Sequence, residues 1–165
     1  MGETENRVIL DRLYDRVWID DTHDFEVMDE VFADDAVVEY PQSGERMRRR
    51  ANIRAVEENY PGLPKVTIRR KVVVGDLALV ESDLDYQGKP YQEVSIFEFR
   101  DGKMVRLTQY FPEPFQAPES RARWVETDAA RTPTGLPRSA RMSCDRGGCP
   151  LYPEDDGAPP AKSSP

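Results

Sequence analysis

Val31-Phe32-Ala33-Asp34-Asp35-Ala36-Val37-Val38-Glu39-Tyr40-Pro41 decides the fold of this chain, because it joins the end of a helix to the start of a sheet. Val31 and Phe32 end an apolar helical face, and the two aspartates that follow predict a turn. The β-branched run after them predicts a short strand. That strand ends at Pro41, since proline has no N–H to donate to a neighbouring strand.

Apolar residues recur every three or four positions on both sides of this join, which indicates three amphipathic helices. The first has its buried stripe at Ile9, Leu10, Leu13, Tyr14, Val17 and Trp18. Asp24 is the expected N-cap of the second, whose buried face is Phe25, Met28, Val31 and Phe32. The third is expected over 50–60, with Ile53, Val56 and Tyr60 facing inward.

The second half of the chain predicts four strands, over residues 66–74, 77–86, 91–100 and 103–111. Gly75-Asp76 and Asp101-Gly102 are two-residue hairpin signals, and a turn over 87–90 joins the middle pair. Consecutive hairpins make an antiparallel meander, and the helices must cover one of its faces. The expected fold class is therefore α+β, a cone of three N-terminal helices packed on a curved, mainly antiparallel sheet.

Composition limits the domain count and the partners. A chain of 165 residues supports one domain, expected over 5–126, followed by a Pro/Gly/Ser-rich tail over 127–165 that is expected to be disordered. Acidic and basic side chains balance in the tail, so the net charge of -8 belongs to residues 1–126. An acidic domain repels phosphate backbones and anionic lipids, so neither nucleic acid nor a membrane is an expected partner.

The N-terminus, the cysteines and the single histidine bear on cellular location and metal binding. The charged N-terminus is unlike a secretory signal, and no segment has the length and apolarity of a membrane span, so a cytoplasmic protein is expected. Cys144 and Cys149 lie in the tail and are expected to be reduced thiols, because a lone pair is a weak zinc signal. His23, the only histidine, falls in a loop. Neither a metal site nor a cofactor is predicted.

Three segments carry a resemblance to a known family. They are the helix-to-strand join, Ser43-Gly44-Glu45-Arg46 followed by Arg50-Ala51-Asn52-Ile53-Arg54, and the hairpin Phe97-Glu98-Phe99-Arg100-Asp101-Gly102-Lys103-Met104-Val105. Their order and spacing over residues 5–126 resemble SnoaL-like domains of the NTF2-like superfamily. That superfamily includes polyketide cyclases and ketosteroid isomerases. The resemblance implies an NTF2-like cone around a small-molecule pocket, but it selects no single reaction.

The resemblance also sets which side of each strand faces the cone. The inward residues are then Ala78, Val80, Ser82, Leu84, Tyr86, Tyr91, Glu93, Ser95, Phe97, Phe99, Val105, Leu107, Gln109 and Phe111. Apolar residues fall on the opposite face, at Val72, Val74, Val94 and Ile96. Exposed β-branched side chains form an adhesive patch unless another subunit covers them, so a homodimer through the sheets is expected.

The chain departs from the ketosteroid isomerases at the positions that carry their chemistry. Their Asp base before the proline corresponds here to Tyr40, which is a poor base at neutral pH. Their oxyanion Asp corresponds to Ser95, and their oxyanion Tyr corresponds, without gaps, to Arg16. The Asp-Arg-Asp relay of limonene epoxide hydrolases cannot be assembled on the inner face either.

Glu93 is the inward carboxylate that remains, and burial is how proteins tune a carboxyl for proton transfer near neutral pH. Glu93 and Tyr40 are therefore the candidate catalytic residues. The expected pocket adds Tyr14, Trp18, Ser82, Ser95, Gln109 and Phe111. The expected ligand is a small apolar carbonyl compound. Three alternatives stay open: Glu93 pairs with Arg106 or Arg69, it points outward through a different strand phase, or the domain is a non-catalytic ligand-binding or dimerisation module.

Overall fold

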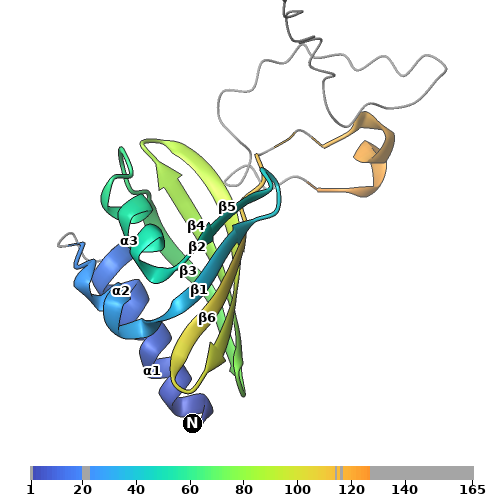
Figure 1. Cartoon of the computed structure of the whole chain (residues 1–165). Helices are drawn as coiled ribbons and strands as arrows, with labels where there is room; N and C mark the ends of the chain where they lie inside the picture. The colour runs from blue at the N-terminus through green and yellow to red at the C-terminus, as the bar shows by residue number, and fades with distance from the viewer. Residues whose placement is uncertain (1, 20–22, 114, 116, 127–165) are drawn as a thin grey trace, which may run out of the picture. The chain divides into compact units, whose positions relative to one another are not determined.

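The structure is a computed structural model that describes residues 2–19, 23–113, 115 and 117–126. The tail predicted over 127–165, with both of its cysteines, lies outside the described residues. Three α-helices and six strands form most of the domain that the structure describes (Figure 1). A short 3-10 helix over Glu119–Trp124 follows them.

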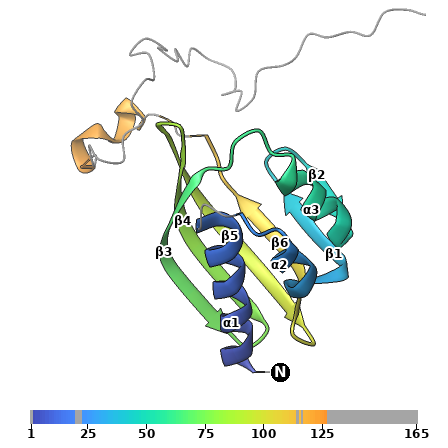
Figure 2. The same cartoon turned by 90° about the vertical axis from the view of Figure 1, so that its left-hand side faces the viewer.

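The helices lie along one face of the sheet (Figure 2). The first, α1 (Glu3–Leu13), contacts β3, while α2 (Glu26–Val31) and α3 (Arg50–Glu58) contact β1. The predicted first stripe is confirmed, and most of it is buried. Its last part, Tyr14–Ile19, is wound as a π-helix instead of continuing the α-helix. Such segments are rare and often lie at functional sites.

The six strands form one mixed sheet in the order β2-β1-β6-β5-β4-β3. Their bounds are β1 Phe32–Tyr40, β2 Glu45–Arg48, β3 Lys65–Val74, β4 Leu77–Tyr86, β5 Lys89–Arg100 and β6 Lys103–Tyr110. The predicted antiparallel meander is confirmed over β3 to β6. The parallel pairing of β1 with β6 brings the helix-to-strand join beside the last strand of the meander.

The predicted turn at Asp34-Asp35 is wrong. Both aspartates lie within β1 and are exposed, in a segment where the pairing jumps from Phe32–Met104 to Val37–Arg106. Five steps along β1 therefore match two steps along β6, so the parallel pairing is interrupted by an irregular bulge. The extra residues let the chain pass directly from α2 into the strand.

Asp24 does not cap α2. The N-cap position is Phe25, which makes no side-chain cap bond, and α2 begins at Glu26. Arg16 Nη2 donates instead to Asp24 Oδ2 at 2.9 Å, and this bond holds the pKa of Asp24 below its ordinary value. An arginine within reach therefore competes successfully with the helix N-terminus for this carboxylate.

The end of α3 also differs from the prediction. The helix begins at Arg50 as expected, but it ends at Glu58, and only Ile53 of its expected inward residues is buried. Val56 and Tyr60 are exposed, because they face a cavity and not the packed core.

The predicted strand phase holds across the sheet. Buried inward residues are Ala78, Val80, Ser82, Leu84, Glu93, Ser95, Phe97, Phe99 and Leu107. On β6 a register shift between Glu98 and Phe99 brings Met104 into the core, and Val105 is only half-buried. On the outer face Val72 is 43% and Val74 65% exposed.

Candidate functional site

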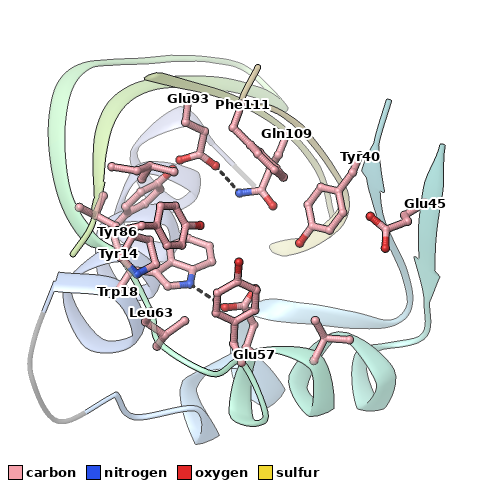
Figure 3. Close-up of a pocket in the computed structure, with 15 residues that line it drawn as sticks. Tyr14, Trp18, Tyr40, Glu45, Glu57, Leu63, Tyr86, Glu93, Gln109 and Phe111 are labelled. Carbon is pink, nitrogen blue, oxygen red and sulfur yellow. Dashed lines mark hydrogen bonds between the residues drawn. The ribbon is translucent and has the colours of Figure 1, made fainter. Parts of the chain in front are cut away.

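A cavity of about 270 Å³ opens between the helices and the concave face of the sheet (Figure 3). Fifteen residues line it. The aromatic ones are Tyr14, Trp18, Tyr40, Tyr60, Tyr86 and Phe111. The aliphatic ones are Val56, Leu63, Pro64, Val66 and Leu84, and the polar ones are Glu45, Glu57, Glu93 and Gln109. A cavity of this size, close to the lower end of small-molecule sites of about 300–1,000 Å³, admits a one- or two-ring compound.

Glu93 presents a buried carboxylate to this cavity, with only 5% of the residue exposed. Ser82 Oγ donates to Oε2 at 2.8 Å and Ser95 Oγ donates to Oε1 at 2.9 Å. Gln109 Nε2 also donates to Oε1. All three donors come from strands paired with β5 or from β5 itself, so the sheet fixes the orientation of the carboxylate.

The arginines that were alternative partners of Glu93 bind other carboxylates. Arg106 pairs with Glu39 and Glu98, and Arg69 pairs with Asp83. Among the residues that the structure describes, no basic side chain forms an ion pair with Glu93. Its partners are two hydroxyls and one amide, which orient the carboxylate without neutralising it.

Tyr14 places a hydroxyl in the same wall. The residue is 1% exposed, and within the described chain its hydroxyl has no hydrogen-bond partner of normal geometry. Burial and the neighbouring Glu93 raise the pKa of Tyr14 far above its ordinary value, and the nearby Ser95 hydroxyl opposes this only in part. Tyr14 therefore stays neutral and keeps a proton that it can donate to a ligand.

Tyr40 lies on the wall formed by the end of β1, with its ring edge toward Phe111 at 5.3 Å between centroids. Burial raises the pKa of Tyr40, and the charges of Glu57, Glu93 and Glu45 raise it further. Tyr40 is accordingly a hydrogen-bond donor and not a base at neutral pH.

Glu57 is the residue that sequence reasoning missed. It projects from α3 into the cavity, where Trp18 Nε1 donates to its Oε2 at 3.2 Å (Figure 3). Burial raises the pKa of Glu57, the Trp18 hydrogen bond opposes the shift, and the charge of Glu93 adds to it. The available signal was its spacing of four residues from the buried Ile53, which places both on one helix face.

The structure brings most of the expected site residues together. Tyr14, Trp18, Tyr40, Glu93, Gln109 and Phe111 all line the cavity. Ser82 and Ser95 are not among the lining residues; they are fully buried behind Glu93 and donate to it. Arg16, at the position of the isomerase oxyanion tyrosine, is exposed and paired with Asp24, outside the lining.

Two further features concern the described part of the chain alone. None of its helices is both long and apolar enough to cross a membrane. Over the same residues, no group of three or more His, Cys, Asp or Glu side chains is arranged to hold a metal ion.

Solved structures with the same fold include several relatives. An NTF2-like protein of unknown function from Burkholderia xenovorans is 38% identical, with a TM-score of 0.66 over 76% of this chain and 97% of its own. A proposed ketosteroid isomerase from Kribbella flavida is 26% identical, with a TM-score of 0.71 over 79% and 94% of the two chains. An LEH-like epoxide hydrolase from M. tuberculosis, at 23% identity and a TM-score of 0.55 over 66% and 84%, shares the fold.

A search of curated protein sequences gave no match. The SnoaL-like domain family matches residues 10–107, which include the end of α1, the helix-to-strand join and most of the sheet. With this match and the shared cone of the solved relatives, the chain belongs to the SnoaL-like domain family of NTF2-like fold.

Proposed function

We propose that this protein is an enzyme that moves a proton at a carbon next to the carbonyl group of a small, mostly apolar compound, with Glu93 as the base. One observation carries the proposal. Glu93 is a buried carboxylate in the wall of the cavity, oriented by Ser82, Ser95 and Gln109 and without a basic partner among the described residues. A positioned general base of this kind contributes about 10²–10⁴-fold to a rate.

In the proposed step a Glu93 oxygen takes the proton from the carbon beside the carbonyl. The electron pair of the C–H bond forms the C=C bond of an enolate, and negative charge develops on the carbonyl oxygen. Tyr14, whose buried hydroxyl has no partner in the described chain, donates a hydrogen bond to that oxygen. Tyr40 is a second neutral donor in the same cavity.

This arrangement differs from the isomerase pattern in the strand that supplies the base. There the base precedes the proline at the end of the first strand, where this chain has Tyr40. Here the carboxylate comes from β5 in the middle of the sheet. The same first step suits isomerase- or cyclase-like outcomes, which differ in where the proton or electrons go next. In a hydrolase-like outcome Glu93 would instead take a proton from water.

A second candidate function is ligand binding without turnover. It is favoured by the donors to Glu93, because Ser82 occupies one carboxylate oxygen while Ser95 and Gln109 occupy the other. Each hydrogen bond to an ionised carboxylate stabilises that form and makes it a weaker base. In this case Glu93 would orient a bound ligand as an acceptor.

Proton exchange in heavy water separates the two candidates. Cyclohexanone and cyclohex-2-enone would be incubated with the protein, and loss of their α-proton signals would be followed by NMR. We expect the wild type to accelerate exchange and Glu93→Gln to lower the rate about a hundredfold. Glu98→Gln, an exposed position on the same strand, is the matched control. Equal rates for wild type and Glu93→Gln would contradict catalysis by Glu93.

A further inference from the structure

The charged groups that line the cavity all have one sign. Glu45, Glu57 and Glu93 line it from β2, α3 and β5, and none of the described lining residues is Lys, Arg or His. Figure 3 shows Glu57 and Glu93 on opposite sides of the cavity. A ligand between them therefore has a carboxyl group on either side.

The basic residues nearby are committed to other carboxylates. Arg46 pairs with Glu39, which lies outside the lining, and Arg54 on the same helix as Glu57 pairs with Asp29 and Glu58. Neither arginine therefore pairs with a carboxylate of the lining. Burial is the main cause that raises the pKa of Tyr14 and of Tyr40, and the next causes are the charge of Glu93 for Tyr14 and the charges of Glu57 and Glu93 for Tyr40.

Aromatic residues make up half of the remaining lining. Tyr14 and Trp18 meet edge to face at 4.9 Å between centroids, and Tyr60 and Tyr86 lie 6.3 Å apart. Tyr40 and Phe111 form a third pair. The face of such a ring attracts a substituted ammonium group, most strongly for Trp and where water is excluded. Six rings and three carboxylates in one cavity make a site for an organic cation.

The Tyr14 hydroxyl, which makes no hydrogen bond of normal geometry within the described chain, is a second sign that a ligand completes this site. It is a buried donor in the cavity wall, and a buried polar group without a partner lowers the stability of the fold. A ligand oxygen next to Tyr14 would supply the missing acceptor. The ligand therefore has an oxygen acceptor on the Tyr14 side and, given the charges, a cation on the Glu57 side.

We propose that the ligand of this cavity is a small carbonyl compound that also carries a substituted ammonium group. The proposal rests on the function proposed above, because it assigns the substrate class of the same cavity. It also removes an electrostatic difficulty of that function. An enolate formed from a neutral ketone would develop negative charge among three carboxylates, whereas a fixed ammonium group on the substrate offsets that charge.

The proton-transfer step on this substrate needs only Glu93 as the base and Tyr14 as the hydrogen-bond donor. The reacting carbon lies between the carbonyl and the ammonium-bearing group. Its C–H bond breaks, the proton goes to Glu93, and the electron pair forms the C=C bond of the enolate. The product is a zwitterion whose two charges cancel, with its oxygen accepting from Tyr14. No oxidant or further reactant is needed.

Binding of a matched pair of probes tests the charge directly. Choline and its neutral carbon analogue, 3,3-dimethylbutan-1-ol, have the same shape and differ in one positive charge. We expect isothermal titration calorimetry to give choline a dissociation constant about tenfold or more lower than that of the alcohol. Glu57→Gln should weaken choline about tenfold and leave the alcohol unchanged. The glutamine carbonyl can still accept from Trp18, which preserves the local fold.

Two controls separate the site from general charge effects. Glu58→Gln removes the same charge from the neighbouring position, which is exposed and outside the lining, and should leave choline binding as in the wild type. Tyr60→Leu should weaken choline, whereas Tyr60→Phe, which keeps the ring, should not. Equal binding of choline and the alcohol, absence of choline binding at millimolar concentration, or equal effects of Glu57→Gln and Glu58→Gln would each overturn the proposal.

Failure of this inference is distinguishable from failure of the proposed function. If neutral ketones exchange protons in a Glu93-dependent way but choline binds no better than the alcohol, the charge assignment is wrong and the proton transfer stands. If choline binds as expected but Glu93→Gln exchanges protons like the wild type, the cation site stands and the proposed base is wrong.

Discussion

Ser82 on β4 and Glu93 on β5 face each other directly across an antiparallel pair, and the Ser82 hydroxyl donates to Glu93 Oε2 at 2.8 Å. Ser95, two residues further along the same face of β5, donates to the other oxygen. The orientation of the carboxylate is therefore set by the register of two central strands. A group held in this way is preorganised for binding or catalysis.

Removing a donor to Glu93 should affect rate more than ligand affinity. Ser82→Ala leaves a buried carboxylate oxygen without its partner, so we expect a loss of stability of about 1–3 kcal/mol. In the proton-transfer assay kcat should fall while KM changes little, because the variant disturbs the base and not the cavity walls. Ser120→Ala, an exposed position in the 3-10 helix after β6, is the control. A fall in stability with kcat unchanged would mean that Ser82 is only structural.

Tyr14→Phe should lower activity without lowering stability, unlike Ser82→Ala. The Tyr14 hydroxyl is buried without a partner in the described chain, so its removal should leave the melting temperature unchanged or raise it. Proton-transfer activity should nevertheless fall, because the donor to the developing oxyanion is lost. Thermal melts and kinetics on the same preparations check both halves. A clear loss of stability would instead indicate that the hydroxyl has a partner within the protein.

Glu57 should make stability fall as pH rises. Its folded-state pKa is raised, chiefly by burial, so between the ordinary glutamate pKa and the folded value the native state binds more protons than the unfolded state. The contribution of Glu57 to the free energy of unfolding is therefore complete at low pH and is lost as the pH rises through this window. The groups that interact with Glu57 are Glu93, Tyr40, Tyr86 and Trp18, and of these only Glu93 adds a charge near neutral pH.

Urea unfolding at several pH values measures this effect. The stability of Glu57→Gln relative to wild type should increase with pH from the ordinary glutamate range upward, since the variant has no proton to lose. Glu58→Gln should show no such trend. A difference between Glu57→Gln and wild type that stays constant with pH would show that Glu57 titrates alike in the folded and unfolded chain.

The outer face of the sheet supports the proposed homodimer. Val72 and Val74 are exposed there, and Val94 and Ile96 on β5 are only half-buried. Val72 and Ile96 flank Leu79 of β4 in the register of the sheet, and we expect sedimentation to give a dimer at micromolar concentration. Val74→Lys should shift it toward the monomer without changing the melting profile of the domain. A wild-type monomer under the same conditions would contradict the assignment.

Sequence reasoning succeeded where one local pattern decides the structure. Alternation with period two, in the phase that the SnoaL-like resemblance supplied, gave the side of each strand that faces the cone, including the inward position of Glu93, and the hairpin signals gave the meander. It failed at β2, because Glu45–Arg48 carries mostly charged side chains and no alternation of apolar residues. A strand of this kind is specified by its pairing with β1 and not by its own composition.

The partners of Glu93 depended on a single turn. A four-residue turn over 87–90 would pair Ser82 with Ser95, whereas Gln87 and Gly88, with φ of 56° and 88°, make a two-residue turn that pairs Ser82 with Glu93. Glu57 was missed for another reason. The helical pattern of apolar residues carries no information about Glu57, and a glutamate on the buried side of a helix indicates a site only once a cavity is known to lie beside it.

The base assignment of Glu93 is tested most directly with a substrate whose reaction needs only a base. In 5-nitrobenzisoxazole a carboxylate removes the ring C–H proton, the N–O bond breaks, and a coloured phenolate is released. Wild type and Glu98→Gln should catalyse this opening equally, and Glu93→Gln should lower kcat/KM about a hundredfold. A Glu93→Gln variant that is folded and as active as the wild type would contradict the claim that Glu93 is the base.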